Sequence, residues 1–186
     1  CMLVLNLPHE LYRNVSSILV YPSTVTTPQR RLGAFEVTLE PVGGPLPILG
    51  QAQLRGPVIL VWDAVKRTAR HPESGHNVVY HEFAHKLDML DGRADGTPPL
   101  HDRAEYQRWS RVCSQEYLAL REQTKRGRHC LLDSYGATNE AEFFAVATEQ
   151  FFDQPGPLRS RHPELYGVLQ AFFRQDPAAR VAARSA

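Results

Sequence analysis

Apolar positions in this chain follow a strand-like pattern near the start and a helix-like pattern afterwards. Residues 17–21 (SILVY) form a short apolar run that stops at Pro22, and residues 35–39 alternate apolar and polar side chains like a half-exposed strand. Residues 57–62 (PVILVW) are continuously apolar and rich in β-branched residues, which predicts the central strand of a sheet. A loop rich in Gly and Pro is expected over residues 43–50.

Helical spacing dominates from residue 77 onward. The first predicted helix is largely buried, about four to five turns long, and stopped by Gly92. Before it, residues 63–75 predict a loop or a helical turn, and residues 93–99 predict a loop after it. Three further helices are expected over residues 103–123, 139–152 and 163–174.

Strands first and helices afterwards indicate an α+β fold. We expect residues 1–186 to form a single domain, because the chain is long enough for one core and shows no internal repeat. The Ala- and Arg-rich residues 175–186 are expected to fray.

Residues 81–85, His-Glu-Phe-Ala-His, carry the most specific chemistry in the sequence. On a helix His81 and His85 face the same way, and Glu82 lies about 100° around the helix from His81. Two imidazoles so placed can bind zinc, and the adjacent carboxylate can reach a metal-bound water without being a ligand. Because a buried helix seldom carries two histidines and an acid without a partner for them, the motif predicts a metal site.

A third metal ligand is needed, because a catalytic zinc ion keeps three protein ligands and an open position for water. Asp91 lies where an extended form of the motif places its third ligand, but that form needs glycine where this chain has Asp88. Glu142 is the stronger candidate, because small neighbours allow its helix to approach the motif helix and phenylalanines around it make an inward carboxylate poorly solvated. Glu142 and Glu149 share a helix face, so at least one of them could orient a ligand histidine.

The composition of the chain argues against several classes of protein. The 186 residues are 42% hydrophobic with a formal net charge of +1, which argues against a direct nucleic-acid role. Cys1, Cys113 and Cys130 fit no CxxC spacing, which argues against a disulfide framework and against a cysteine-ligated zinc site. No apolar run of about eighteen residues and no signal peptide is visible, so we expect no membrane role and a cytoplasmic location.

Two long segments of the chain resemble a known family. HEFAHKLDMLDG (residues 81–92) and DSYGATNEAEFFAVATEQFF (residues 133–152) are similar to the Mlc titration factor A family of bacterial zinc peptidases, related in its catalytic core to anthrax lethal factor. The likeness continues more weakly through ILVYP (residues 18–22) and GPVILVWD (residues 56–63). It implies a zincin-like metallopeptidase domain, with a small sheet followed by a helical part that holds the HExxH helix and a second ligand-bearing helix. Members of that family usually begin with a further helical segment.

The resemblance also implies roles for single residues. His81, His85 and Glu142 match the ligands of one Zn²⁺ per chain, Glu82 matches the general base, and Tyr135 matches a tyrosine that assists catalysis. Judged from its own surroundings, Tyr135 stands in a turn where its phenol could donate to an oxyanion or pack as an ordinary aromatic side chain.

Together these observations predict a zinc-dependent metallopeptidase of the gluzincin type, which has HExxH and a downstream Glu. We expect it to hydrolyse peptide or protein substrates with a metal-activated water, in an aminopeptidase-like manner tied to the regulation of sugar uptake. The resemblance implies a further partner, a transcriptional repressor of sugar-uptake genes. The alternative is therefore a binding module that sequesters this repressor and whose zinc site is structural or vestigial.

Overall fold

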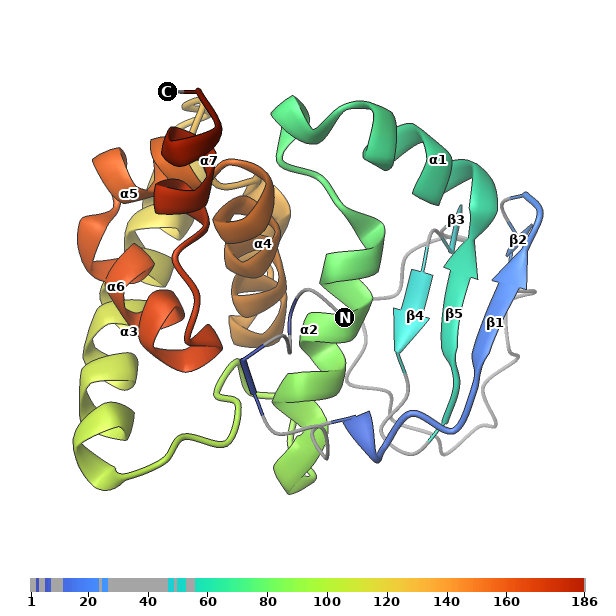
Figure 1. The fold of residues 1–186 in the computed structure, drawn as a ribbon, viewed down its shortest axis with the longest axis horizontal. Coiled ribbons are helices and arrows are strands. Elements are labelled where there is room, and N and C mark those ends of the chain that lie inside the picture. The colour runs from blue at the N-terminus through green and yellow to red at the C-terminus, as the bar shows by residue number, and fades with distance from the viewer. Residues whose placement is uncertain are drawn as a thin grey trace.

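The computed structural model describes residues 3, 6–7, 12–23, 25–26, 47–48, 50–52 and 56–185. Within this part of the chain a small sheet and a larger group of helices flank helix α2, which runs between them (Figure 1). The strands are β1 (Ile18–Tyr21), β2 (Val25–Thr26), β3 (Pro47–Ile48), β4 (Gly50–Ala52) and β5 (Val58–Val61).

Strand β5 is the centre of a three-stranded sheet with the order β1-β5-β4. Strand β1 pairs with it in parallel, with Ile18 opposite Val58, and β4 pairs antiparallel, with Gly50 opposite Leu60. Strands β2 and β3 form a separate antiparallel pair. The buried, β-branched Val58 and Val61 explain the central place of β5 and confirm the prediction made from the apolar run.

Seven α-helices lie in the described part of the chain, joined by short 3₁₀ turns. The α-helices are α1 (Trp62–Arg70), α2 (Val78–Asp88), α3 (Arg103–Lys125), α4 (Glu140–Asp153), α5 (Pro155–Arg161), α6 (Pro163–Phe173) and α7 (Pro177–Ser185). Short 3₁₀ turns include η3 (Pro72–Ser74), η4 (Met89–Asp91) and η5 (Ser134–Ala137). The helices predicted over residues 103–123, 139–152 and 163–174 are confirmed as α3, α4 and α6.

Three predictions about local structure need correction. Residues 62–70 form helix α1 and not a loop or single turn; the charged residues hid it, since only Ala64 of this helix is buried. The motif helix is shorter than expected, because its α-helical part ends at Asp88 and η4 forms the last turn before Gly92. The end of the chain, expected to fray, is helical in α7, with Ala178 buried.

Some predictions fall on positions outside the described residues, including the strand at residues 35–39 and most of the loop at residues 43–50. Among the described residues, no helix combines the length and the apolar character that crossing a membrane requires. Cys113 and Cys130 are free thiols.

The hydrophobic core lies among the helices, and α4 runs through it. Ten consecutive residues of α4, from Phe143 to Phe152, are buried, so this helix is covered on all sides. Phe144 and Phe151 both stack on Phe173 of α6, with ring centroids 6.5 Å and 5.6 Å apart. Because α2 packs directly against α4, the core fixes the position of α4 relative to the motif helix.

The motif helix is also tied to the sheet side of the molecule. Lys86 is fully buried, and its ammonium donates to the backbone carbonyls of Gly56, at 2.8 Å, and Asn14, at 3.3 Å. In return the Asn14 amide donates to the carbonyl of Lys86 at 2.8 Å. Helix α2 is therefore held from both sides, by the helical core and by the segments next to β1 and β5.

Candidate metal centre

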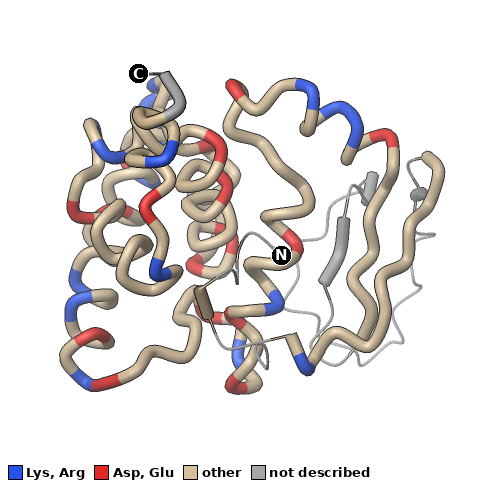
Figure 2. Tube along the Cα trace, viewed as in Figure 1, with Lys and Arg blue, Asp and Glu red and all other residues tan. Residues whose placement is uncertain are grey.

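Two capped helix ends bring the candidate ligands together. Asn77 caps α2 by accepting a hydrogen bond from the N–H of Tyr80, and Asn139 caps α4 by accepting one from the N–H of Glu142 at 2.9 Å. Ala84 on α2 and Ala145 on α4 are fully buried, and such small residues allow close packing of helices. Acidic positions are spaced along α4 in Figure 2.

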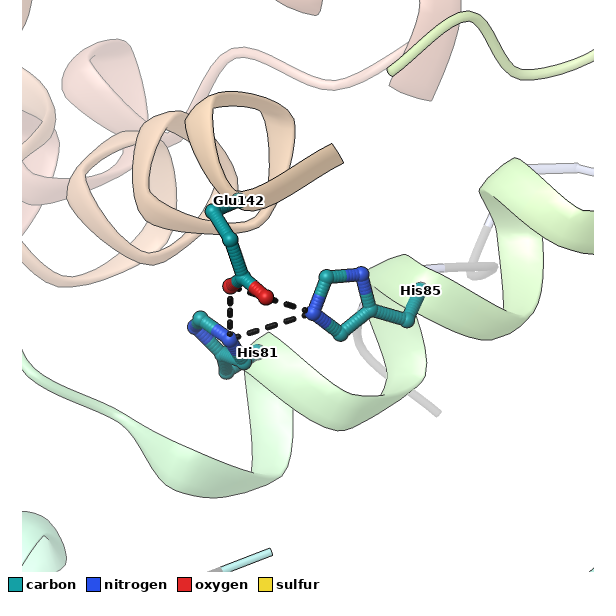
Figure 3. Close-up of side chains that lie close together, drawn as sticks. All are labelled: His81, His85 and Glu142. Carbon is teal, nitrogen blue, oxygen red and sulfur yellow. Dashed lines mark hydrogen bonds and ion pairs between the residues drawn. The ribbon is translucent and has the colours of Figure 1, made fainter. Parts of the chain in front are cut away.

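His81, His85 and Glu142 converge on one point between the two helices (Figure 3). One ligand atom from each residue lies within 4.8 Å of the others. The Nε2 atom of His81 lies 2.9 Å from Oε2 of Glu142 and 3.2 Å from Nε2 of His85, and the His85 atom lies 3.4 Å from the same Glu142 oxygen. In the part of the chain that the structure describes, this is the one group of three such residues able to hold a metal ion.

The donor set suits a catalytic metal. Two imidazole nitrogens and one carboxylate oxygen are ligands that zinc accepts, and three protein ligands leave a position for water. A structural zinc site normally has four protein ligands, mostly Cys and His. The residues present therefore fit a metal ion that keeps an open position.

Charge holds the three side chains in this arrangement. Burial by itself would lower the pKa of His81, but hydrogen bonds to Glu142 and Glu149 outweigh it and raise the pKa to about 10. Burial would raise the pKa of Glu142, but the two histidines outweigh it and lower the pKa to about 2. The positive charge of His81 and the negative charge of Glu142 therefore stabilise one another at this point.

Glu149 makes the remaining contact to the first histidine. Its Oε1 lies 2.8 Å from Nδ1 of His81, on the side of the ring opposite Glu142. The backbone N–H of Asn77 donates to the other Glu149 oxygen. The sequence indicated that at least one of Glu142 and Glu149 could orient a histidine. In the structure Glu149 contacts Nδ1 of His81, and Glu142 belongs to the group of three residues that could hold a metal ion.

Glu82 lies next to the centre without joining it. Its side chain is only 5% exposed, and burial raises its pKa to about 7 against the opposing effect of the two histidines. Glu82 is not one of the three residues whose ligand atoms lie together between the helices. Glu82 is thus a buried acid beside the candidate ligands, and its role as general base stays a prediction.

Tyr135 borders the same site from the turn η5. Its ring centroid lies 5.9 Å from that of His81, and 54% of the residue is exposed. Partial burial, with the negative charges of Glu142 and Glu82, raises the pKa of Tyr135 to about 12, so its hydroxyl keeps its proton. The protonated phenol therefore lies beside the centre, and a hydrogen bond to Glu142 is among the causes that raise its pKa.

Asp91, the other candidate for the third ligand, is not part of the group. It lies in η4, and its Oδ1 accepts a hydrogen bond from the N–H of Arg93 at 2.9 Å. Asp88 is fully buried and accepts from the N–H of Gly96 at 3.0 Å, so it anchors the loop that follows the motif helix. The chain therefore does not turn back to the metal centre after α2.

Two histidines and a glutamate gathered between two helices, with a buried acid beside the first histidine, define a metallopeptidase-like domain. The match to known sequences is more specific. This chain belongs to the family described as glucose-regulated metallo-peptidase M90, whose model matches residues 1–174.

Relatives of this chain include proteins of cyanobacteria and enterobacteria. It is 37% identical over 183 residues to an uncharacterized protein of Synechocystis sp., a match covering 95% of this chain and 64% of the relative. It is 38% identical over 143 residues to Mlc titration factor A of Edwardsiella ictaluri, a match covering 74% of this chain and 53% of the relative. It is 34% identical over 181 residues to Mlc titration factor A of Serratia proteamaculans, covering 96% of this chain and 67% of the relative. The matched region thus spans between about half and two thirds of these relatives, and the family resemblance seen in the two sequence segments is confirmed.

Proposed function

We propose that this chain is a zinc peptidase whose metal ion is held by His81, His85 and Glu142. The observation that carries the proposal is the convergence of their three ligand atoms within 4.8 Å, between two helices fixed by the core. Because the donor set leaves an open coordination position, it favours a catalytic ion over a structural one.

Each neighbouring side chain has a task in this mechanism. A zinc ion in the site would polarise the scissile carbonyl and lower the pKa of a bound water. Glu82, beside the first ligand and shielded from solvent, would take a proton from the attacking water as its oxygen bonds to the carbonyl carbon, and would pass it to the leaving amine as the C–N bond breaks. Tyr135 donates a hydrogen bond to the carbonyl oxygen as negative charge develops on it.

The substrate that suits this chemistry is a peptide or a protein. We propose an aminopeptidase-like, gluzincin-type specificity, in line with the sequence prediction. A panel of substrates with free and blocked amino termini tests that part separately, because cleavage of blocked peptides alone contradicts an aminopeptidase.

A second candidate function rests on the names of the relatives. Several are called Mlc titration factor A, which suggests an interaction with the Mlc repressor, and the sequence resemblance implies a transcriptional repressor of sugar-uptake genes as partner. In this alternative the chain binds the repressor and the metal site is structural or vestigial. The presence of Glu82 and Tyr135 beside the ligands favours the enzyme, because a structural site needs neither.

The decisive experiment compares wild type with Glu82→Gln. Metal content is measured first, and both proteins are then assayed on chromogenic amino-acid and short-peptide substrates, with and without a chelator. We expect one zinc per chain in both proteins, chelator-sensitive hydrolysis by wild type, and a loss of about 10²-fold or more in the variant. The matched control is Glu140→Gln, an exposed glutamate on the first turn of α4, which should keep full activity.

Two outcomes contradict the proposal. Zinc-loaded wild type without hydrolysis of any substrate removes the peptidase, and full activity of zinc-loaded Glu82→Gln removes the assigned base. Repressor binding is measured alongside, because a binding module predicts equal affinity for wild type and Glu82→Gln, whatever their activity.

A further inference from the structure

Asp133 shapes the turn that carries Tyr135. Its Oδ1 accepts a hydrogen bond from the N–H of Tyr135 at 2.6 Å, and its backbone carbonyl accepts one from the N–H of Gly136 at 3.0 Å. Side chain and backbone of Asp133 therefore both fix the start of η5. The direction in which Tyr135 leaves the backbone depends on these two bonds.

The other oxygen of Asp133 reaches a different segment. Oδ2 lies 3.2 Å from Nε2 of His76, in the loop between η3 and α2. The next residue, Asn77, caps α2 with its side chain and donates its N–H to Glu149, the acid on His81. One carboxylate thus links the Tyr135 turn to the entrance of the helix that carries the candidate ligands.

The loop that holds His76 is itself firmly attached. The carbonyl of Gly75 accepts a hydrogen bond from the Gln150 amide at 3.3 Å, and a Cβ at Gly75 would collide with that same amide group. Gly75 also has φ +68°, which a residue with a side chain rarely adopts. His76 is therefore presented to Asp133 from a fixed backbone.

The turn η5 packs tightly against helices α3 and α4 at Gly136. A Cβ at Gly136 would lie 3.3 Å from side-chain atoms of both Leu120 on α3 and Val146 on α4. Packing thus fixes the backbone of the turn at Gly136, whereas Tyr135 itself is 54% exposed and has, among the described residues, one ring contact, with His81. The position of Tyr135 therefore depends largely on the backbone that Asp133 holds.

We propose that Asp133 is a positioning residue, which, together with His76, holds the Tyr135 hydroxyl at the distance from the metal centre that catalysis needs. This inference rests on the proposed peptidase function and on the assigned role of Tyr135. It predicts that loss of Asp133 acts on the reaction through Tyr135, and that an ordinary turn cap elsewhere has no such effect.

The test is a double-mutant cycle in the zinc-loaded protein. Asp133→Ala should lower kcat by about 10-fold to 100-fold, because a small displacement of a group acting on the transition state is costly, with KM and zinc content unchanged. In a Tyr135→Phe background the same substitution should add less than about twofold, because the hydroxyl it positions is already gone. Asp133→Asn should recover much of the activity, since its amide oxygen can still accept from the N–H of Tyr135.

A matched control separates positioning from general stability. Asp95 accepts a hydrogen bond from the N–H of Thr97 at 3.1 Å, the same local pattern on a loop outside the metal centre, so Asp95→Ala should leave kcat unchanged. His76→Ala keeps the turn cap but removes the link to α2, and it should lower kcat in the same direction as Asp133→Ala by a smaller factor. Hydrogen exchange of the Tyr135 amide in the zinc-free protein supplies a readout without activity, and it should be faster in Asp133→Ala than in wild type.

The outcomes distinguish this inference from the proposed function. If wild type is active and Asp133→Ala keeps wild-type kcat, or if its loss is fully additive with that of Tyr135→Phe, Asp133 does not position the tyrosine and only this inference fails. If Asp133→Ala does not fold, His76→Ala decides: wild-type kcat in this variant, or a loss fully additive with that of Tyr135→Phe, contradicts the inference. Zinc-loaded wild type without peptidase activity overturns the proposed function, and this inference with it.

Discussion

Nδ1 of His81 and Oε1 of Glu149 lie 2.8 Å apart, on the side of the ring that faces away from Glu142. The glutamate is 5% exposed, and the backbone N–H of Asn77 donates to its other oxygen, so both of its oxygens are engaged. A histidine whose Nδ1–H donates to a carboxylate keeps the tautomer and orientation that leave Nε2 free for a metal. Glu149 thereby fixes the ring that presents the first ligand atom.

Glu149→Gln should weaken zinc binding by about 10-fold to 100-fold, the usual effect of removing a carboxylate behind a ligand histidine. The substitution keeps the size of the side chain and an acceptor oxygen, so the fold should persist. Zinc affinity is measured by competition with a chromogenic chelator, with Glu140→Gln on the exposed start of α4 as the control. Equal affinity of Glu149→Gln and wild type would show that the contact with His81 does not support the metal.

The third ligand is tested by a pair of substitutions. Glu142→Ala should strip the metal or weaken it strongly, because its oxygen lies 2.9 Å from Nε2 of His81 and 3.4 Å from Nε2 of His85. Asp91→Ala should leave the metal bound, since the Asp91 side chain caps the N–H of Arg93 outside the centre. Zinc content by atomic absorption gives the result, and the reverse pattern would mean that the assignment is wrong. Loss of the metal should also lower the melting temperature.

Sequence patterns predicted the elements whose burial repeats regularly. The apolar run at residues 57–62 predicted β5, and helical spacing predicted α3, α4 and α6, because each buries one regular face or is covered on all sides. Helix α1 was missed, since Ala64 is its only buried residue and periodicity has little to act on there. Helix α7 was missed for a related reason: residues 179–183 are exposed, so no regular buried face marks it, although Asp176 followed by Pro177 is a helix-start signal.

The candidate site was predicted more completely than the fold around it. The spacing of His81 and His85 needs only a helix, which local sequence supplies, and the choice of Glu142 needed only that its helix pack on the first. The contact between Asp133 and His76 joins residues 57 positions apart in loops, where no periodicity exists to reveal it. Similarly, which of Glu142 and Glu149 orients a histidine stayed open, because it depends on the rotation of α4, which tertiary packing decides.

Tyr135→Phe should lower kcat by about 10²-fold to 10³-fold, the usual effect of removing one donor to a developing oxyanion. The ring stays, so its packing beside His81 and the zinc content should be unchanged, and KM should change little. Single-turnover kinetics confirm that kcat reports the chemical step. Activity within about twofold of wild type would leave Tyr135 a packed aromatic side chain and would assign the reaction to zinc and Glu82 without it.

The final prediction concerns the attachment of helix α7 to the core. Asp176 precedes this helix, and its Oδ1 accepts from the Tyr166 hydroxyl at 2.6 Å and from the N–H of Ala179 at 3.0 Å. The Gln170 amide donates to Oδ2 at 3.2 Å, and the Tyr166 oxygen accepts from the N–H of Ala178 at 3.1 Å. The Tyr166 hydroxyl, followed by the Ala179 N–H, lowers the pKa of Asp176 below its ordinary value of 3.8.

A carboxylate with a lowered pKa in the folded state stabilises the protein above its unfolded pKa, and this contribution is lost as pH falls through the folded value. At neutral pH Asp176→Asn should therefore lower the free energy of unfolding by about 1 kcal/mol or less, since the site is partly solvated and the amide oxygen can still accept from the Tyr166 hydroxyl and the Ala179 N–H. The difference between wild type and variant should persist down to pH 3.8 and shrink below it. Urea unfolding at a series of pH values measures this difference. In a Tyr166→Phe background it should be smaller at neutral pH, because the strongest donor to the carboxylate is absent. A difference that stays constant with pH, or grows on acidification, would mean that the charge of Asp176 does not hold α7 in place.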